Sequence, residues 1–410
     1  MPVTRLLLAS TATLLATGVA RAQYAEGFDS QASADVTIQA EPDTNVMFVD
    51  YSNMTIGGST FSIPEAPRRI PGSAATSGIL MQANLTAAAT AAVNVLAGAT
   101  PITFSGRYRV SFDAWQNVPV NPSLGGSTEQ MLWGVSVDGI APLECRHNLA
   151  LGAQGIYGWL AGENGYSLED AVICEAGTRV GQLGDQQTGQ GVFFNEAFDQ
   201  PWVPTAPNNA PANQWVRVDI DVDQSLIRVY FNGVEFFNYS ALVPPSGFAM
   251  IGYEDPFTSL GTQPDDQWGL FDNFRVTVPA ACAAQGSSMI QGTATDGEIL
   301  SGAADPMVGA PMTIRLRGGP SSGLALLNMG FPSPITIPIP LGGCTLMTEV
   351  LGNLANLIVV CDTLGNSNFT IEVPAGTGLC GGAFGFQYFF LGSSPCGVVH
   401  TEGLALTIGS

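Results

Sequence analysis

The sequence contains no lysine, two histidines and few charged residues of either sign. Charged residues make up 11% of the 410 residues, against about a quarter in ordinary soluble proteins, so long charged helices are not expected. The 13 basic residues are all arginines and face 34 acidic residues, giving a formal net charge of −21. This field repels a phosphate backbone, so nucleic acid and anionic lipid surfaces are excluded as expected partners. Neutral polymers and cations remain open.

The shortage of histidine restricts the catalytic chemistry. His147 and His400 are the two histidines of the chain, and neither follows the pattern of a nucleophile elbow. A Ser-His-Asp or Cys-His site in either half of the chain would depend on one histidine. A zinc site with several imidazole ligands is also disfavoured.

Long apolar runs are missing after the first 22 residues. Met1–Ala22 combines an early Arg5, the apolar stretch Leu6–Val19 and the sequence Ala-Arg-Ala before Gln23, which is typical of a secretory signal peptide. No later segment has ~18 uninterrupted apolar residues, so we expect no transmembrane span in the mature chain. The expected location is secreted or in the cell envelope, extracellular or periplasmic.

Seven cysteines agree with an oxidising compartment, and none has the paired CxxC spacing of a zinc site. Spacing alone does not fix the connectivity. The shortest closures would leave Cys282 unpaired and join three pairs: Cys145 with Cys174, Cys344 with Cys361, and Cys380 with Cys396. We expect such bridges to staple loop-rich β structure.

Strict alternation of apolar and polar residues is the main structural signal. Within residues 106–116, one parity is apolar and the other polar, and residues 131–137 and 215–223 repeat the pattern. Residues 226–231 and 234–237 flank Asn232-Gly233, a strong hairpin signal. The sequence therefore predicts antiparallel β structure. The Ala-rich stretch Ala83–Ala99 is compatible with a helix, a strand or a loop.

A change of composition divides the chain in two. Residues 23–282 hold 27 acidic residues and 9 arginines, whereas residues 283–410 hold 7 and 2 and are dense in Gly and Pro. Turn signals and short apolar runs predict a compact sandwich in the second part. We expect a first sandwich over 23–279, a linker over 280–290 and a smaller β-sandwich over 291–410.

The closing strands of the first part resemble a known family. Trp215-Val-Arg-Val-Asp-Ile-Asp-Val-Asp, the hairpin Ile227-Arg-Val-Tyr-Phe-Asn-Gly-Val and Gly269-Leu-Phe-Asp-Asn-Phe-Arg-Val together are similar to concanavalin A-like lectin/glucanase sandwiches of the LamG-like group. The resemblance implies an all-β jelly roll, with a concave face that binds glycans in many members. The last third resembles a β-rich C-terminal module of planctomycete-type secreted proteins, which implies no activity.

The resemblance also raises a catalytic hypothesis. Glucanases of this fold carry an E-x-D-x-E strand, and Asp219, Asp221 and Asp223 occupy the corresponding pattern with Asp at both Glu positions. Positions i and i+4 of a strand lie ~13 Å apart, whereas a retaining pair needs carboxyls ~5 Å apart. Asp219 and Asp223 are therefore weak catalytic candidates, and a solvated strand face is the simpler interpretation.

One carboxylate has the parity of an inward-facing residue. Asp272 shares it with Phe274 and Val276, and a buried carboxylate needs a partner. In the resembled family this position is sometimes near a calcium site. The resemblance therefore suggests calcium as a cofactor, with oxygen ligands from Glu26, Asp29, Asp272 and Asn273. Hydrogen bonding to backbone amides is the alternative.

Aromatic residues among Gly, Asn and acidic residues are the candidate ligand-binding groups: Tyr157, Trp159, Tyr166, Trp202 and Tyr253. Such rings serve as stacking platforms for sugars, although each alone is more often a buried anchor. We therefore interpret the chain as a secreted, non-catalytic carbohydrate-binding or surface adhesion protein, with a polysaccharide or cell-surface glycan as partner. The alternatives are a glycoside hydrolase or polysaccharide lyase, and a structural cell-envelope or matrix protein.

Overall fold

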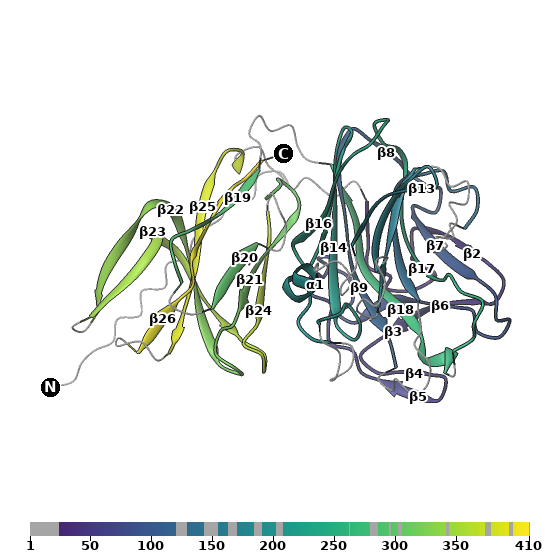
Figure 1. Cartoon of the computed structure of the whole chain (residues 1–410), viewed down its shortest axis with the longest axis horizontal. Helices are drawn as coiled ribbons and strands as arrows, with labels where there is room; N and C mark the ends of the chain where they lie inside the picture. The colour runs from purple at the N-terminus through teal and green to yellow at the C-terminus, as the bar shows by residue number, and fades with distance from the viewer. Residues whose placement is uncertain are drawn as a thin grey trace.

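In the computed structural model, the regular secondary structure is almost entirely β-strand and is arranged as two sandwiches (Figure 1). The structure describes residues 24–119, 129–142, 155–162, 170–183, 191–201, 208–261, 263–278, 286–294, 297–301, 306–341, 344–373, 379–392 and 397–409. The expected fold class, an all-β jelly-roll sandwich with a second, smaller sandwich, is confirmed. The expected signal peptide, residues 1–22, lies outside the described residues.

Sheet A forms one layer of the first unit and pairs its strands antiparallel. Its order is β16 (Val234–Ser240), β15 (Leu226–Phe231), β14 (Trp215–Asp223), β9 (Arg107–Asn117), β18 (Trp268–Thr277), β6 (Ser77–Ala83) and β3 (Thr44–Asp50), with β1 (Tyr24–Glu26) also on β18.

Sheet B forms the second layer of the first unit. Its order is β13 (Thr178–Leu183), β12 (Ala171–Glu175), β11 (Ile156–Ala161), β10 (Gln130–Val137), β17 (Ser246–Asp255), β7 (Ala91–Ala97) and β2 (Val36–Ala40), with β8 (Thr103–Ser105) also on β17. The Ala-rich stretch is thus strand β7 preceded by a loop. Short elements complete the unit: the hairpin β4 (Met54–Ile56) and β5 (Ser59–Phe61), helix α1 (Gly191–Ala197) and the 3-10 turn η2 (Pro264–Asp266).

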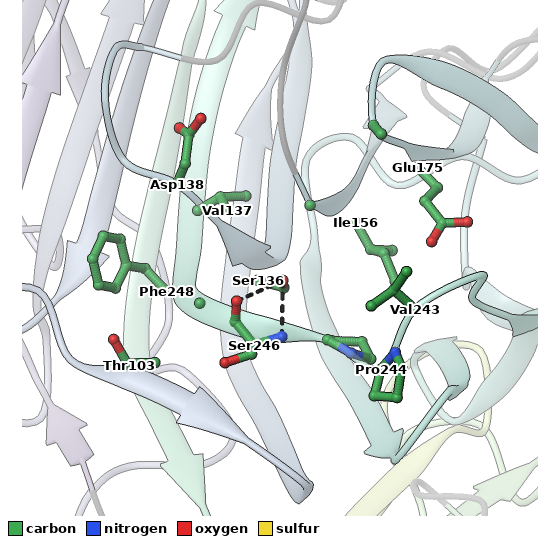
Figure 2. Close-up of a pocket in the computed structure, with 14 residues that line it drawn as sticks. Thr103, Ser136, Val137, Asp138, Ile156, Glu175, Val243, Pro244, Ser246 and Phe248 are labelled. Carbon is green, nitrogen blue, oxygen red and sulfur yellow. Dashed lines mark hydrogen bonds between the residues drawn. The ribbon is translucent and has the colours of Figure 1, made fainter.

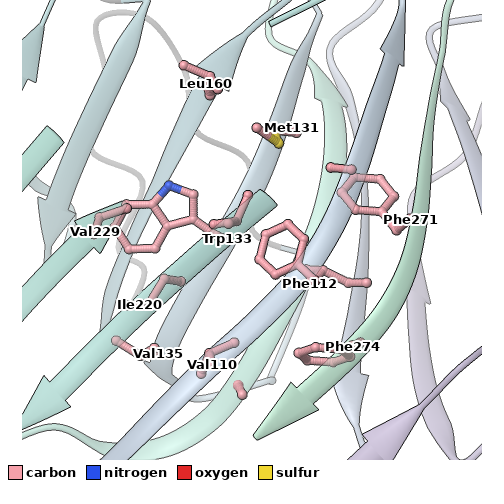
Figure 3. Packing of buried hydrophobic residues seen from close by; sticks show 14 of the residues in the cluster. Val110, Phe112, Met131, Trp133, Val135, Leu160, Ile220, Val229, Phe271 and Phe274 are labelled. Carbon is pink, nitrogen blue, oxygen red and sulfur yellow. The ribbon is translucent and has the colours of Figure 1, made fainter. Parts of the chain in front are cut away.

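The core of the first unit lies between the two sheets, where the alternation of the sequence directs it. In the register of β9 on β14, Val110 pairs with Ile220 and Phe112 with Val218, and all four side chains are fully buried. They meet Met131, Trp133 and Val135 from β10 of sheet B (Figure 3). The period of two therefore separates the core face of each strand from its outer face.

Two further sheets form the second unit. Sheet C has the order β19 (Ser287–Gln291), β27 (Gly403–Thr407), β25 (Ala383–Leu391), β22 (Leu324–Leu341) and β23 (Cys344–Val360), with β26 (Val398–His400) on β25; sheet D is β20 (Glu298–Ser301), β21 (Pro311–Arg317) and β24 (Ser367–Glu372). Strand β19 corrects the expected linker: residues 287–290 belong to sheet C because β19 pairs with β27.

The two units touch through the outer face of sheet D. Arg317 of β21 donates to the Asn195 carbonyl at 2.8 Å and forms an ion pair of 3.1 Å with Asp199. Arg315 lies 3.5 Å from the same carboxylate and donates to the Asn232 carbonyl. Burial and the neighbouring arginines lower the pKa of Arg315 well below its ordinary value. Asp199 is thus a carboxylate shared by two arginines at this contact.

Among the described residues, no helix is long and apolar enough to cross a membrane.

The Asp199→Asn variant should loosen the contact between the units. It removes the carboxylate beside Arg315, whose side chain is 3% exposed, and hydrogen bonds to charged groups contribute about 1.5–3 kcal/mol. All six tryptophans precede residue 279, so their fluorescence follows the first unit, while far-UV circular dichroism follows both. In urea, we expect the two transitions to separate in the variant. Asp223→Asn, on a side chain that is 45% exposed, is the control. Coincident transitions with an unchanged midpoint in Asp199→Asn would contradict this role.

Candidate functional site

A pocket of about 520 Å³ opens at one end of sheet B, beside the start of β17 (Figure 2). Segments from β8, the end of β10, the turn between β12 and β13 and the chain before β17 enclose it. Its lining combines apolar side chains with hydroxyl and carboxyl groups, among them Thr103, Ser136, Asp138, Ile156, Glu175, Val243, Pro244 and Phe248. The volume lies within the ~300–1,000 Å³ range of small-ligand sites.

Ser136 shapes the floor of this pocket. The register of β10 on β17 shifts between Gly134 and Val137, and Ser136 adopts the left-handed conformation with φ of 62°. Its hydroxyl donates to the Ser246 carbonyl and accepts from the Ser246 amide, both at 3.0 Å, so it replaces ladder bonds that the bulge interrupts. The dashed lines of Figure 2 mark this pair.

Close backbone packing makes the floor rigid. A β-carbon on Gly155 would stand 2.2 Å from the Ser136 carbonyl oxygen, and one on Gly247 would stand 2.7 Å from the Ser136 backbone. Only glycine permits this approach at either position. The pocket is therefore formed before any ligand arrives.

Two carboxylates give the pocket a negative character, because Asp138 and Glu175 are the charged side chains among the described residues that line it. Glu175 is held in place by the Tyr239 hydroxyl and by the Leu242 amide, which donates at 3.0 Å. Asp138 is exposed and accepts from the Ile140 amide at 3.1 Å. Both groups retain oxygen lone pairs for a ligand.

Phe248 connects the pocket to the outer face of sheet B. Its partly buried ring packs against a cluster that faces away from the sandwich core and includes Leu132, Tyr157, Trp159 and Met250. This outer-face cluster is separate from the core between the sheets. The pocket therefore lies at the end of a second apolar layer.

Polar groups accompany the outer-face cluster. With the Gln130 amide in the orientation that satisfies both neighbours, it donates to Glu254 at 3.0 Å and accepts from the Trp159 indole at 3.2 Å. The Arg179 guanidinium lies 5.8 Å from the Trp159 ring centroid, as in a cation–π contact. These residues form a polar network on the outer face of sheet B, apart from the core between the two sheets.

Three predicted stacking residues are buried instead of exposed. Tyr157 and Trp159 lie in β11 and Tyr253 in β17, and each is at most 2% exposed. The Tyr253 ring belongs to the core, and its hydroxyl donates to Glu129. The expectation of loop-borne platforms is thus corrected, because the flanking residues extend both strands around these rings. Tyr166 and Trp202 lie outside the described residues.

The two weak catalytic candidates do not converge. Asp219 and Asp223 lie on the outer face of sheet A, the face opposite the core. Asp219 is 1% exposed and accepts from Arg68 at 2.7 Å and from Ser111 at 2.8 Å. Asp223 is partly buried, with its side chain 45% exposed, and forms an ion pair of 3.6 Å with Arg107. Asp219 therefore has a structural role, because its carboxylate binds Arg68 and so holds the segment around Arg68 against sheet A. The sequence did not indicate this contact.

The four predicted calcium ligands are engaged by donors of the protein itself. Glu26 accepts from the Phe28 and Asp35 amides, and Asp29 accepts from the Ala74 amide. Asn273 accepts from the Ile70 amide through its Oδ1 and donates to Asp113 through its Nδ2. Among the described residues no group of three or more His, Cys, Asp or Glu is arranged to hold a metal. These residues do not fit the expected calcium site.

The sequence predicts that Asp272 faces inwards with Phe274 and Val276, but it lies on the outer face of sheet A beside Tyr51. The register of β18 on β9 shifts between Asp272 and Arg275, where Asn273 has φ of 58°, so the parity of the strand changes after Asp272.

Asp272 is 1% exposed, and it accepts from the Tyr51 hydroxyl at 2.8 Å and the Asn273 amide at 2.6 Å. It stands opposite Asp113 in the register of β18 on β9. Burial, together with the nearby charge of Asp113 and against the hydrogen bond from Tyr51, raises the pKa of Asp272 to about 8.

Two of the expected disulfides are absent. Cys174 and Cys361 are buried free thiols, and burial raises the pKa of Cys174 to about 12. Cys344 begins β23 and Cys361 follows its end. Because a strand rises ~3.3 Å per residue, the two cysteines lie much farther apart than a disulfide can span. Cys380 is disulfide-bonded. Cys145 and Cys396 lie outside the described residues, so the pairing of Cys380 with Cys396 stays a prediction.

The pocket residues escaped the sequence analysis. Thr103, Ser136, Glu175 and Phe248 are distant in the chain and have ordinary local contexts. Pro244-Pro245 before an apolar strand was the available signal, because it marks a fixed loop.

No family model matches the chain, and no curated protein matches it. Solved structures that resemble it include a protein of unknown function with a galectin-like fold from Bacillus subtilis, at 9% identity over 63% of this chain and 97% of that one, with a TM-score of 0.34. The carbohydrate binding module CBM66 from Bacillus subtilis is 9% identical over 58% of this chain and 96% of that one, with a TM-score of 0.29. The exoplasmic/lumenal domain of VIP36 in its Ca²⁺/Man-bound form is 7% identical over 64% of this chain and 91% of that one, with a TM-score of 0.34.

The resemblance of residues 291–410 to a planctomycete-type module stays a prediction.

The Asp272→Asn variant should reduce the pH dependence of stability. Because the pKa of Asp272 is raised from 3.8 to about 8, the folded protein keeps a proton that the unfolded chain releases. The associated stability is complete below about pH 4 and is lost as the pH rises to about 8, by at most ~1.4 kcal/mol per pH unit. The uncharged amide has no such loss. In urea denaturation from pH 4 to 9, the free energy of unfolding of the variant relative to that of the wild type should increase as the pH rises. Exposed Asp265→Asn is the control; parallel wild-type and Asp272→Asn curves would refute the assignment.

Proposed function

We propose that the protein is a secreted, non-catalytic carbohydrate-binding protein and that the pocket beside Phe248 holds a neutral or amine-bearing saccharide. The pocket supports this proposal because it places an aromatic ring beside hydroxyl and carboxyl groups in a preformed cavity of about 520 Å³. Saccharides are bound by such a combination: the ring covers the apolar face of a sugar and oxygen atoms bond its hydroxyls. Export is proposed from the composition of Met1–Ala22.

The charge of the pocket restricts the class of saccharide. Asp138 and Glu175 are the charged residues in the described part of its lining, and the whole chain carries a net charge of −21. Sulfated or uronic-acid sugars would meet like charge at short range. A neutral sugar can donate its hydroxyls to the carboxylates, and an amino sugar can add a charged hydrogen bond.

The hydrolase or lyase alternative receives no support from the expected carboxylates. Asp219 is locked by Arg68 and Ser111 on the outer face of sheet A, away from the pocket. A glycosidase needs two carboxyls on opposite sides of one bond. Asp219 and Asp223, the expected pair, bind different arginines and do not line the pocket, so we propose binding without turnover.

A structural role in the cell envelope or an extracellular matrix is a second proposal. Burial of Tyr157, Trp159 and Tyr253 favours it, because aromatic side chains that are packed against other residues contribute to rigidity and not to recognition. The two proposals are compatible, since a matrix protein can also hold a glycan. They differ in whether the pocket has a ligand.

Substitutions in the pocket should separate stacking from charge. Phe248→Ala should weaken saccharide binding about tenfold or more by removing the ring. Glu175→Gln keeps hydrogen-bonding atoms, so it should weaken amine-bearing sugars about tenfold and neutral sugars little. Calorimetry with neutral glucan or mannan oligosaccharides and with chitosan oligosaccharides measures both effects.

Val180→Ala, on β13 and outside the pocket lining, is the control. Thermal unfolding of each variant shows whether its fold is intact. If the wild type retains none of these sugars, or if folded Phe248→Ala binds like the wild type, the proposed site is refuted.

A further inference from the structure

Sheet C carries a large exposed apolar patch on its outer face. Five aliphatic side chains, each between 37% and 80% exposed, form this sheet C patch: Leu324, Leu326, Ile358, Val360 and Leu391. Leu324 pairs with Val360 and Leu326 with Ile358 across β22 and β23. On the other side, Leu326 pairs with Phe389 of β25, which is 8% exposed. The side chains are therefore contiguous across three strands.

The same strands are also apolar on their inner face. Ala325, Leu327, Val359 and Phe390 alternate with the patch residues and pack in the core of the second unit. A sheet with one solvated face normally alternates apolar and polar residues, whereas strands that are apolar on both faces belong to sheets covered on both sides. The sequence of sheet C thus corresponds to a sheet with a covered outer face.

The first unit does not provide this cover. It contacts the opposite side of the second unit, where Arg315 and Arg317 project from sheet D. Figure 1 shows β22 and β23 at the end of the second unit that points away from the first. The patch therefore faces outwards in the part of the chain that the structure describes.

The chemistry of the patch selects its occupant. The next cross-strand set on these strands consists of the uncharged amides Asn328, Asn356 and Gln387. These neighbours offer no opposite charge to an acidic or a basic partner. Its exposed side chains are aliphatic, and its one aromatic ring is nearly buried, which disfavours stacking on sugars. The complementary surface is another uncharged aliphatic sheet face.

Charge distribution favours a second copy of this chain. Residues 23–282 have a net charge of −18 and residues 283–410 have −5, from the acidic and arginine counts of each part. Two copies that meet through sheet C keep their strongly acidic first units at opposite ends, which minimises like-charge repulsion. A two-fold axis makes the patch its own complement.

We propose that the protein self-associates as a symmetric dimer by stacking the sheet C patches of two copies face to face. Each patch then occupies the position of a second layer, as in a β-sandwich. The pockets beside Phe248, in the first units, stay open at the two ends. A dimer of this form presents two saccharide sites, although self-association does not depend on them.

Sedimentation of the full chain from about 1 to about 100 µM tests the proposal. We expect the wild type to reach twice the mass of a single chain. Ile358→Asp and Leu391→Asp place a carboxylate on side chains that are 73% and 80% exposed, so the fold should persist while self-association weakens at least tenfold. Leu242→Asp, at an 87% exposed residue of the first unit, is the matched control and should remain dimeric.

A charge-pairing experiment identifies the face. Ile358→Asp and Ile358→Arg should each be monomeric alone at low micromolar concentration, and an equimolar mixture should regain dimer mass. A single-chain mass for the wild type at every concentration would overturn the proposal. A dimer that persists in Ile358→Asp and Leu391→Asp would also overturn it. So would a monomeric wild type that binds an apolar resin when Ile358→Asp does not, because the patch would then be exposed in solution.

Discussion

The centre of sheet A has to satisfy two buried environments at once. On its inner face, β9 and β14 contribute Val110, Phe112, Val218 and Ile220 to the core. On its outer face, Asp113 and Asp219 are fully buried and share the guanidinium of Arg68, at 2.8 and 2.7 Å. Removing such a cation would leave two carboxylates without compensation in a dry environment. The contact therefore fixes the segment around Arg68 onto the sheet and keeps the two central strands in register.

Sheet B divides its two faces differently. Its inner face completes the core, and its outer face holds a second layer of aromatic and polar side chains that ends at Phe248. Where β10 bulges, Ser136 turns the chain away from the ladder, and the space that results is the pocket. A local break in strand pairing thus places hydroxyl, carboxyl and aromatic groups around one cavity, while the surrounding sandwich holds them rigid.

The second unit connects polar and apolar surfaces in a fixed direction. Sheet D presents Arg315 and Arg317 to Asp199 of the first unit, whereas sheet C presents aliphatic side chains outwards. The charged contact is oriented by hydrogen bonds, and the aliphatic face has no such constraint. A protein built in this way can hold its two units together through ionic contacts and still offer a separate surface for association.

The amino-acid sequence by itself determined the strongly alternating strands and the side chains that they direct inwards, because side-chain direction in a strand follows from a period of two along the chain. Tyr108, Val110 and Phe112 could be assigned to a core from their spacing alone. Only the tertiary structure decided which strands became neighbours. That choice brought Arg68 to Asp219, set Ser136 against Ser246, separated Cys344 from Cys361 and buried Trp159. Such contacts join residues far apart in sequence, and local periodicity carries no information about their partners.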